Sequence, residues 1–139
     1  MDKSWKFMTE QDLMFEKEIG RVHYWHYHPE TAEKAEFYMV KVVMPVGGAH
    51  NFHVHPESHE MLYIIKGTAE QWVENEKKLL NEGDSVYIAA NVAHGTFNAA
   101  DEELHFLAIL SPAGGWDAGT IDVGDQEPYA SYRSNEIRK

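Results

Sequence analysis

GGAHNFHVHPESHEMLYIIKG, residues 47–67, carries more information about this chain than any other stretch. His53 and His55 stand one residue apart, and Glu60 follows five residues after the second. In an extended strand alternate side chains share a face, so the two imidazoles are expected to point the same way. Pro56 opens a turn signal, and Glu60 then leads an apolar run, MLYII, that is typical of the next strand. Two imidazoles and a carboxylate arranged in this way can converge on a divalent metal ion.

A second stretch, residues 83–98, supplies a fourth candidate ligand. It reads GDSVYIAANVAHGTFN, which is a Gly-Asp turn, a strand over 85–89, a short loop and a further strand. His94 stands at the start of that last strand. We therefore predict that His94 completes the group.

Both stretches resemble the two motifs of the cupin superfamily. The first reads G-x5-H-x-H-x4-E-x6-G, with every fixed position filled. In the second motif, G-x5-P-x-G-x2-H-x3-N, Gly83, His94 and Asn98 match, whereas Ala89 replaces the proline and Asn91 the glycine. Asparagine tolerates positive φ better than most residues, so Asn91 is expected to make the turn. The resemblance covers roughly residues 36–112.

The resemblance is to the small, single-domain, metal-binding cupins with a cupin-2 type conserved barrel. It implies an all-β fold, the double-stranded β-helix (jelly-roll) barrel, and one metal ion held by His53, His55, Glu60 and His94. It also implies a homodimer and a structural or supporting role for Asn98. Because cupins host many unrelated reactions, the resemblance does not choose among oxidation, isomerisation, lyase chemistry and decarboxylation.

The rest of the chain agrees with an antiparallel sandwich or barrel of about eight or nine short strands. Outside the motif stretches, strands are predicted over 21–28, 36–44, 68–74, 77–80 and 103–110. We predict three parts: an N-terminal arm over 1–20, in which Thr9 caps a short helix, a barrel over 21–112, and a tail over 113–139. The tail is poor in apolar residues, so we expect it to pack on the barrel or on a partner subunit.

Composition excludes several classes of protein. The 139 residues suit one domain, and the absence of cysteine excludes disulfides, thiolate metal sites and a cysteine nucleophile. A formal net charge of −11 disfavours nucleic acid and anionic lipid as partners. No apolar run approaches the ~18 residues of a membrane span, and no secretory signal precedes the first strand. We therefore expect a cytoplasmic protein that binds a small molecule.

Three imidazoles and one carboxylate suit a divalent transition metal: Fe, Mn, Ni, Cu, Co or Zn. Calcium and magnesium prefer oxygen ligands and are disfavoured. A six-coordinate ion with four protein ligands keeps about two positions for substrate or dioxygen, and it polarises what it binds. The first hypothesis is a metalloenzyme for a small oxygenated substrate, with dioxygenase-like oxidation favoured and lyase or isomerase chemistry next. The alternative is a non-catalytic small-molecule-binding cupin with a structural or vestigial metal.

Other polar and aromatic residues have two interpretations. His50 and His59 are solvent-facing side chains near a turn, or they support the ligands or the substrate. His23, His26 and His28 belong to a half-buried edge strand, or they line the barrel mouth. No general acid or base is identified, although a pocket histidine or tyrosine is expected to move a proton. Four aromatic residues are interpreted as core or pocket wall: Tyr63, Trp72, Phe97 and Phe106.

Overall fold

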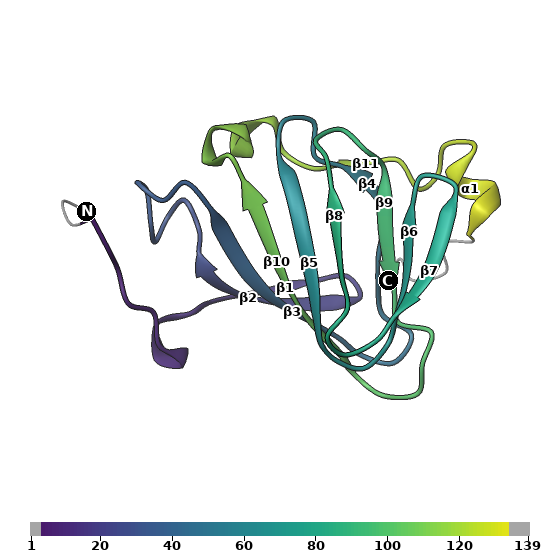
Figure 1. Ribbon diagram of the computed structural model, residues 1–139, viewed down its shortest axis with the longest axis horizontal. Coiled ribbons are helices and arrows are strands. Elements are labelled where there is room, and N and C mark those ends of the chain that lie inside the picture. Colours follow the sequence, from purple (N-terminus) through teal and green to yellow (C-terminus); the bar gives the residue numbers. More distant parts are fainter. Residues whose placement is uncertain (1–3, 134–139) are drawn as a thin grey trace.

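The computed structural model of the protein describes residues 4–133, which form two antiparallel sheets (Figure 1). The six-stranded sheet has the order β1-β2-β3-β10-β5-β8, and the five-stranded sheet has the order β11-β4-β9-β6-β7. The first contains β1 (Met14–Glu18), β2 (Arg21–Tyr27), β3 (Tyr38–Met44), β10 (Leu104–Ser111), β5 (His59–Lys66) and β8 (Ser85–Ile88). The second contains β11 (Ile121–Asp122), β4 (Ala49–Val54), β9 (His94–Phe97), β6 (Ala69–Val73) and β7 (Glu76–Leu80). The double-stranded β-helix expected from the sequence is confirmed.

The barrel interior is packed at one end and hollow at the other. β3 and β10 alternate strictly between buried and half-buried residues, as strands do when one face meets a core. Met44 pairs with Leu104 across these strands, and both are fully buried with Ile64 in the apolar core. Further along the same strands, Val40 pairs with Ala108, and both line a cavity. The alternating pattern therefore builds both the core and the floor of a site.

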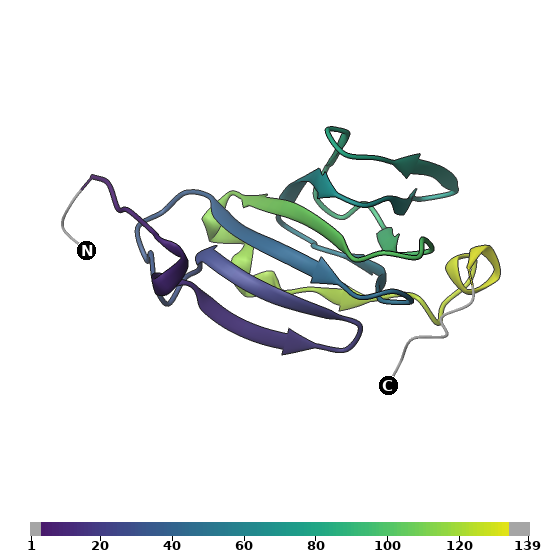
Figure 2. The same ribbon diagram turned by 90° about the horizontal axis from the view of Figure 1, so that it is seen from below.

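The N-terminal residues differ from the expected arm. Thr9 caps a 3-10 helix, η1 (Glu10–Asp12), as predicted, and its backbone amide and hydroxyl both donate to the Asp12 carboxylate, at 3.0 and 2.9 Å. Residues 14–18, however, form β1, which pairs with β2 along its whole length. The strand predicted over 21–28 is thus not at the edge of the sheet, because β1 pairs with it and takes the edge position. Figure 2 shows this hairpin beside β3.

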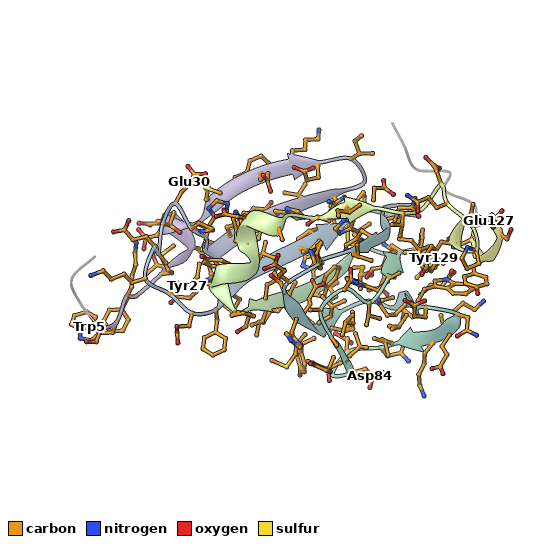
Figure 3. All side chains as sticks on the ribbon, turned by 90° about the horizontal axis from the view of Figure 1, so that it is seen from above. Trp5, Tyr27, Glu30, Asp84, Glu127 and Tyr129 are labelled. Carbon is orange, nitrogen blue, oxygen red and sulfur yellow. The ribbon has the colours of Figure 1, made fainter. Side chains whose placement is uncertain are left out.

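The C-terminal segment runs back over the barrel as η2 (Ala113–Ala118), β11 and α1 (Tyr129–Tyr132). Trp116 in η2 lies edge-on to Trp25 and Tyr38, with ring centroids 5.5 and 5.1 Å apart. Tyr129, labelled in Figure 3, stacks on Phe52 outside the five-stranded sheet, at 5.1 Å. Two aromatic residues therefore hold a segment that has few apolar residues of its own. The proposed boundaries of arm, barrel and tail stay predictions, and residues 1–3 and 134–139 lie outside the described part.

Asn98 ties the packed end of the barrel together. Its side-chain amide donates to the carbonyl oxygens of Met44, Pro45 and Glu102, at 3.2, 3.0 and 2.8 Å. Its side-chain oxygen accepts from the Ala100 amide at 3.2 Å. A buried amide with several partners holds neighbouring turns in register, which is a structural role. Within residues 4–133, no helix is long and apolar enough to cross a membrane.

Candidate metal centre

The four side chains singled out by the motifs meet inside the barrel. His53 on β4 lies directly across from His94 on β9, while His55 follows β4 and Glu60 comes from β5. One candidate ligand atom from each lies within 4.8 Å of all the others. The Glu60 carboxylate is 2.8 Å from His94 Nε2 and 3.2 Å from His55 Nε2. All four residues are 2–8 % exposed, so this is a buried group that could bind a metal ion.

Each imidazole has its second ring nitrogen held from behind. His53 Nδ1 donates to the Asn51 carbonyl at 2.6 Å, and His94 Nδ1 donates to the Val92 carbonyl at 3.0 Å. His55 Nδ1 lies 3.1 Å from the Thr120 hydroxyl. Such outer contacts orient the rings, and a bond from Nδ1 to a carbonyl leaves the lone pair of a neutral imidazole on Nε2, where a metal can bind it. The donor set and its orientation therefore fit a borderline divalent transition metal.

The charges of the group are strongly coupled. Burial raises the pKa of Glu60, but hydrogen bonds from His55 and His94 outweigh it and leave the pKa lowered. Burial lowers the pKa of His94, but the Glu60 carboxylate outweighs it and the net shift is upward. For His53, burial and then repulsion from the other two imidazoles lower the pKa well below its usual range. The carboxylate thus stays ionised, and His53 stays neutral, which are the forms that bind metals.

The loop before His94 is well fastened despite its departures from the motif. Asn91 adopts φ +65°, the conformation expected for it in place of glycine. Its amide donates to the His55 carbonyl at 2.8 Å, which ties the loop to another ligand residue. On the other side, Ala93 and Glu74 exchange two hydrogen bonds of 2.9 and 3.0 Å. Backbone contacts of this kind replace part of the rigidity that a proline supplies.

The group faces a cavity of about 280 Å³, near the lower limit for small-molecule sites. Apolar residues of the six-stranded sheet and several polar residues line it. The polar residues, apart from the four candidate ligands, are Glu16, Glu18, Arg21, His23, His28, His50, Thr96 and Thr120. An apolar wall with several convergent polar groups is typical of a site for a small polar molecule.

His50 lies beside the candidate ligands. Of its two interpretations, a solvent-facing side chain had been the more expected one. It stacks on His53 with ring centroids 3.6 Å apart and planes 7° apart. Residues three apart on a regular strand point to opposite faces, but β4 has a bulge between His50 and His53 that puts both inside. A single-residue bulge leaves no clear mark in the sequence, which is why the alternation could not assign His50.

The remaining predicted positions divide between the cavity and the surface. His23 and His28 line the cavity, whereas His59 is exposed and lies 2.5 Å from the Tyr87 hydroxyl. No tyrosine among the described residues lines the cavity, so a histidine is the remaining candidate for proton transfer there. Tyr63 is 49 % exposed on the outer face of β5 and is not core, because it follows buried Leu62 in the alternation. Trp72, Phe97 and Phe106 do pack internally or against core residues.

Sequence reasoning did not single out two further cavity residues. Arg21 begins β2 on the same face as His23 and Trp25, and that alternation was the available signal. Thr120 lies in the C-terminal segment, 65 residues from the histidine it contacts. No spacing rule connects such distant positions, so only the folded chain reveals this contact.

Comparison with known proteins agrees with this architecture. The model of the family "Cupin domain" matches residues 40–110, just over half of the chain. The protein is a cupin. This cupin is 28 % identical over 85 residues to an uncharacterised protein of Methanocaldococcus jannaschii, covering 61 % of this chain and 68 % of that one.

Two solved structures share the fold of this cupin at low identity. KdgF from a Halomonas species superposes with a TM-score of 0.67 and 20 % identity, covering 78 % of this chain and 94 % of that one. A predicted oxalate decarboxylase from Thermotoga maritima superposes with a TM-score of 0.69 and 16 % identity, covering 77 % and 99 %. These likenesses concern the fold alone.

Proposed function

We propose that this cupin is a metal-dependent enzyme that acts on a small oxygenated substrate. In this proposal His53, His55, Glu60 and His94 are the metal ligands. Oxidation of the dioxygenase type is the favoured reaction, and lyase or isomerase chemistry is next. The observation that carries the proposal is the convergence of four buried ligand atoms within 4.8 Å at the wall of a polar-lined cavity.

A divalent ion held by three neutral imidazoles and one carboxylate would supply a net charge of +1 and polarise an oxygen of the substrate. The protein itself contributes by orienting the ligands and by excluding bulk water. The Nδ1 contacts hold the rings, and the apolar residues of β3 and β10 keep bulk water away from the reacting group. A cavity histidine (His28 or His50) is then in place to take or return a proton.

The alternative is a cupin that binds a small molecule without transforming it and keeps a metal for structure. An apolar cavity without polar groups would favour that alternative. The cavity of this protein instead presents carboxylates, an arginine and additional histidines. These groups support the enzyme hypothesis. The Thermotoga neighbour, named for a reaction of the small dicarboxylate oxalate, is a precedent for such a substrate on this fold.

The deciding measurement is the metal content, by elemental assay, of the untagged protein beside a His53→Ala/His94→Ala double variant. His105→Ala on the outer face of β10 is the matched control, since it removes an imidazole far from the group. We expect about one equivalent of iron, manganese, nickel, copper, cobalt or zinc in the native protein and control, and none in the double variant. Circular dichroism of all three checks that the fold survives.

The metal that is found decides the next step. A redox-active metal directs the next assay to oxygen uptake with small oxygenated substrates. Zinc shifts weight toward lyase or isomerase chemistry. A native protein that holds no metal, and takes up none when each ion is added, would overturn the enzyme proposal and leave the binding cupin.

We also propose that the protein is a homodimer, joined through the outer face of the six-stranded sheet. Five large apolar residues are exposed there on β1, β5 and β8: Phe15, Met61, Tyr63, Ile65 and Tyr87. Large apolar side chains exposed on one sheet face favour a protein–protein contact there. Two copies of one sheet face can pack on each other around a two-fold axis. Location in the cytoplasm stays a prediction from the sequence.

A further inference from the structure

Arg21 brings a positive charge into the cavity that holds the candidate metal ligands. It begins β2 on the inner face of the six-stranded sheet, and it is half-buried. In the sheet order, β3 and β10 separate β2 from β5, the strand that provides Glu60. Arg21 and Glu60 therefore line one cavity from separate strands of the same sheet.

A short network holds the guanidinium in place. Arg21 Nε donates to His23 Nε2 at 3.1 Å, and Nη1 donates to the Ile19 carbonyl at 3.1 Å. His23 Nδ1 in turn donates to Glu16 Oε1 at 2.9 Å, and Trp25 Nε1 donates to the same oxygen at 3.1 Å. Because His23 Nε2 accepts a hydrogen bond from Arg21, its lone pair is on Nε2 and the imidazole is neutral in this arrangement. Two donors on one carboxylate oxygen and two acceptors on one guanidinium orient Arg21 from behind.

The same guanidinium has no direct ion-pair partner among residues 4–133. Glu18 stands across from Arg21 in the β1–β2 register, yet no carboxylate oxygen comes within 4.0 Å of it. Nη2 also has no hydrogen-bond partner in the described part of the chain. A partly desolvated cation with an unused donor edge is unfavourable unless an anion completes it. A guanidinium fork matches a carboxylate in a two-point contact.

We propose that Arg21 binds a carboxylate group of the substrate, so that the substrate is a small carboxylic acid whose second oxygen group faces His53, His55, Glu60 and His94. This inference rests on the proposed function. It adds to it the chemical class of the substrate and a specificity-determining residue. Glu16 and Glu18 line the same cavity and repel an anion, so Arg21 has to outweigh them. Removing the Arg21 charge should therefore weaken the binding of an anion, whereas removing a glutamate charge should strengthen it.

The test is calorimetric titration with glycolate, with its neutral counterpart glycolamide and with inorganic phosphate. It uses metal-free and manganese-loaded protein. We expect Arg21→Gln to weaken glycolate binding by roughly 10- to 100-fold, the range for losing a charged hydrogen-bond partner, and to leave glycolamide unchanged. Arg21→Lys, which keeps the charge without the fork, should lose less. Glu18→Gln should tighten glycolate binding. Lys17→Gln, on the outward face of the same hairpin, is the matched control.

The outcomes separate this proposal from the metal site. A protein that takes up no metal but still binds glycolate through Arg21 contradicts the proposed function alone. Glycolate binding that is equal in Arg21→Gln, Arg21→Lys and wild type overturns the role of Arg21. Preference for glycolamide, preference for phosphate, or no glycolate binding in either form overturns the carboxylate assignment. If Arg21→Gln keeps the metal content of wild type, any loss of glycolate binding comes from the missing contact with the carboxylate and not from missing metal.

Discussion

At the scale of single residues, the hydrogen-bond partners of the Nδ1 atoms decide how well the candidate histidine ligands are oriented toward a metal. The Nδ1 contacts of His53 and His94 are to backbone carbonyls two residues away in sequence, so they form wherever these segments form. The contact of His55 is different, since its partner is the hydroxyl of Thr120 in the C-terminal segment. One of the three orienting contacts therefore depends on a side chain and can be removed cleanly.

Thr120→Val should weaken metal binding by about 10- to 100-fold, because valine keeps the shape of threonine but cannot hold His55 Nδ1. Thr120→Ser keeps the hydroxyl and is the matched control, with affinity close to wild type. Competition with a chromophoric chelator measures both. If valine and serine bind metal equally well, the hydroxyl does not orient the ring.

The half-buried histidine behind Arg21, His23, makes the stability of the protein depend on pH. Burial lowers the pKa of His23 below its usual 6.5, against the opposing pull of Glu16 and Glu18 and with added repulsion from Arg21. Between pH 6.5 and the lower folded value, the unfolded chain therefore binds a proton that the folded chain does not. Stability from this residue is complete above 6.5 and is lost as pH falls through that window.

His23→Gln should accordingly show a smaller fall in the free energy of unfolding between pH 7 and pH 5 than wild type. The other histidines contribute to both proteins, so the difference between the two curves isolates His23. His105→Gln, on the outer face of β10, is the control. Urea unfolding at several pH values measures the slopes, and parallel curves for wild type and His23→Gln would contradict the argument.

At the scale of elements, turns and a bulge place the site more than the strands do. The β4 bulge turns His50 and His53 to one side, and the loop before β9 aims His94 at Glu60. That loop depends on the positive φ of Asn91. The hydrogen bond that the Asn91 backbone amide donates to the His55 carbonyl then couples two ligand-bearing segments.

Asn91→Val should lower the free energy of unfolding by about 1–3 kcal/mol, because a β-branched residue is strained at positive φ. Asn91→Gly should stay within about 1 kcal/mol of wild type, since glycine adopts this φ freely. Ala90→Val adds a similar side chain at the neighbouring position, which has no positive φ, and is the control. Equal losses in Asn91→Val and Ala90→Val, measured by denaturant unfolding, would show that bulk and not φ is responsible.

At the scale of the whole molecule, the six-stranded sheet has two different apolar faces. Leu62 and Ile64 on β5 are buried in the barrel, while Met61 and Tyr63 alternate with them on the outside. Trp5, in the N-terminal segment, lies at one end of the molecule (Figure 3), is 59 % exposed and lines a groove with Met61 of the outer face. The outer face and this segment are the surfaces that a second copy would cover.

Tyr63→Glu should weaken dimerisation by at least about 30-fold, because it places a charge among the exposed apolar residues of the proposed interface. Leu79→Glu on β7 is the matched control, since Leu79 is 59 % exposed but belongs to the other sheet. Sedimentation velocity over a range of concentrations measures both. A wild-type protein that sediments as a monomer throughout would contradict the dimer.

The fold and the four candidate ligands could be predicted from the sequence because the information is local. Strand alternation, a turn at Pro56 and fixed spacing already place His53, His55 and Glu60 relative to one another. Asn91 was recognisable as a turn residue for the same reason. The first strand, Met14–Glu18, was missed because its alternation of apolar and polar residues is short and weak. Its pairing with β2 is what makes it a strand.

The sequence by itself therefore determined the strands of the two motif stretches and the four candidate ligands on them, and its resemblance to the cupins implied the barrel. Only the tertiary structure decided what else reaches the cavity. Arg21 enters through the pairing of β2 with β3, His50 through a bulge, and Thr120 through a chain segment that returns from the far end of the sequence. Local patterns set the direction of a side chain within its own strand. The meeting of residues far apart in sequence depends on strand order, register and chain path, which are properties of the whole packed barrel.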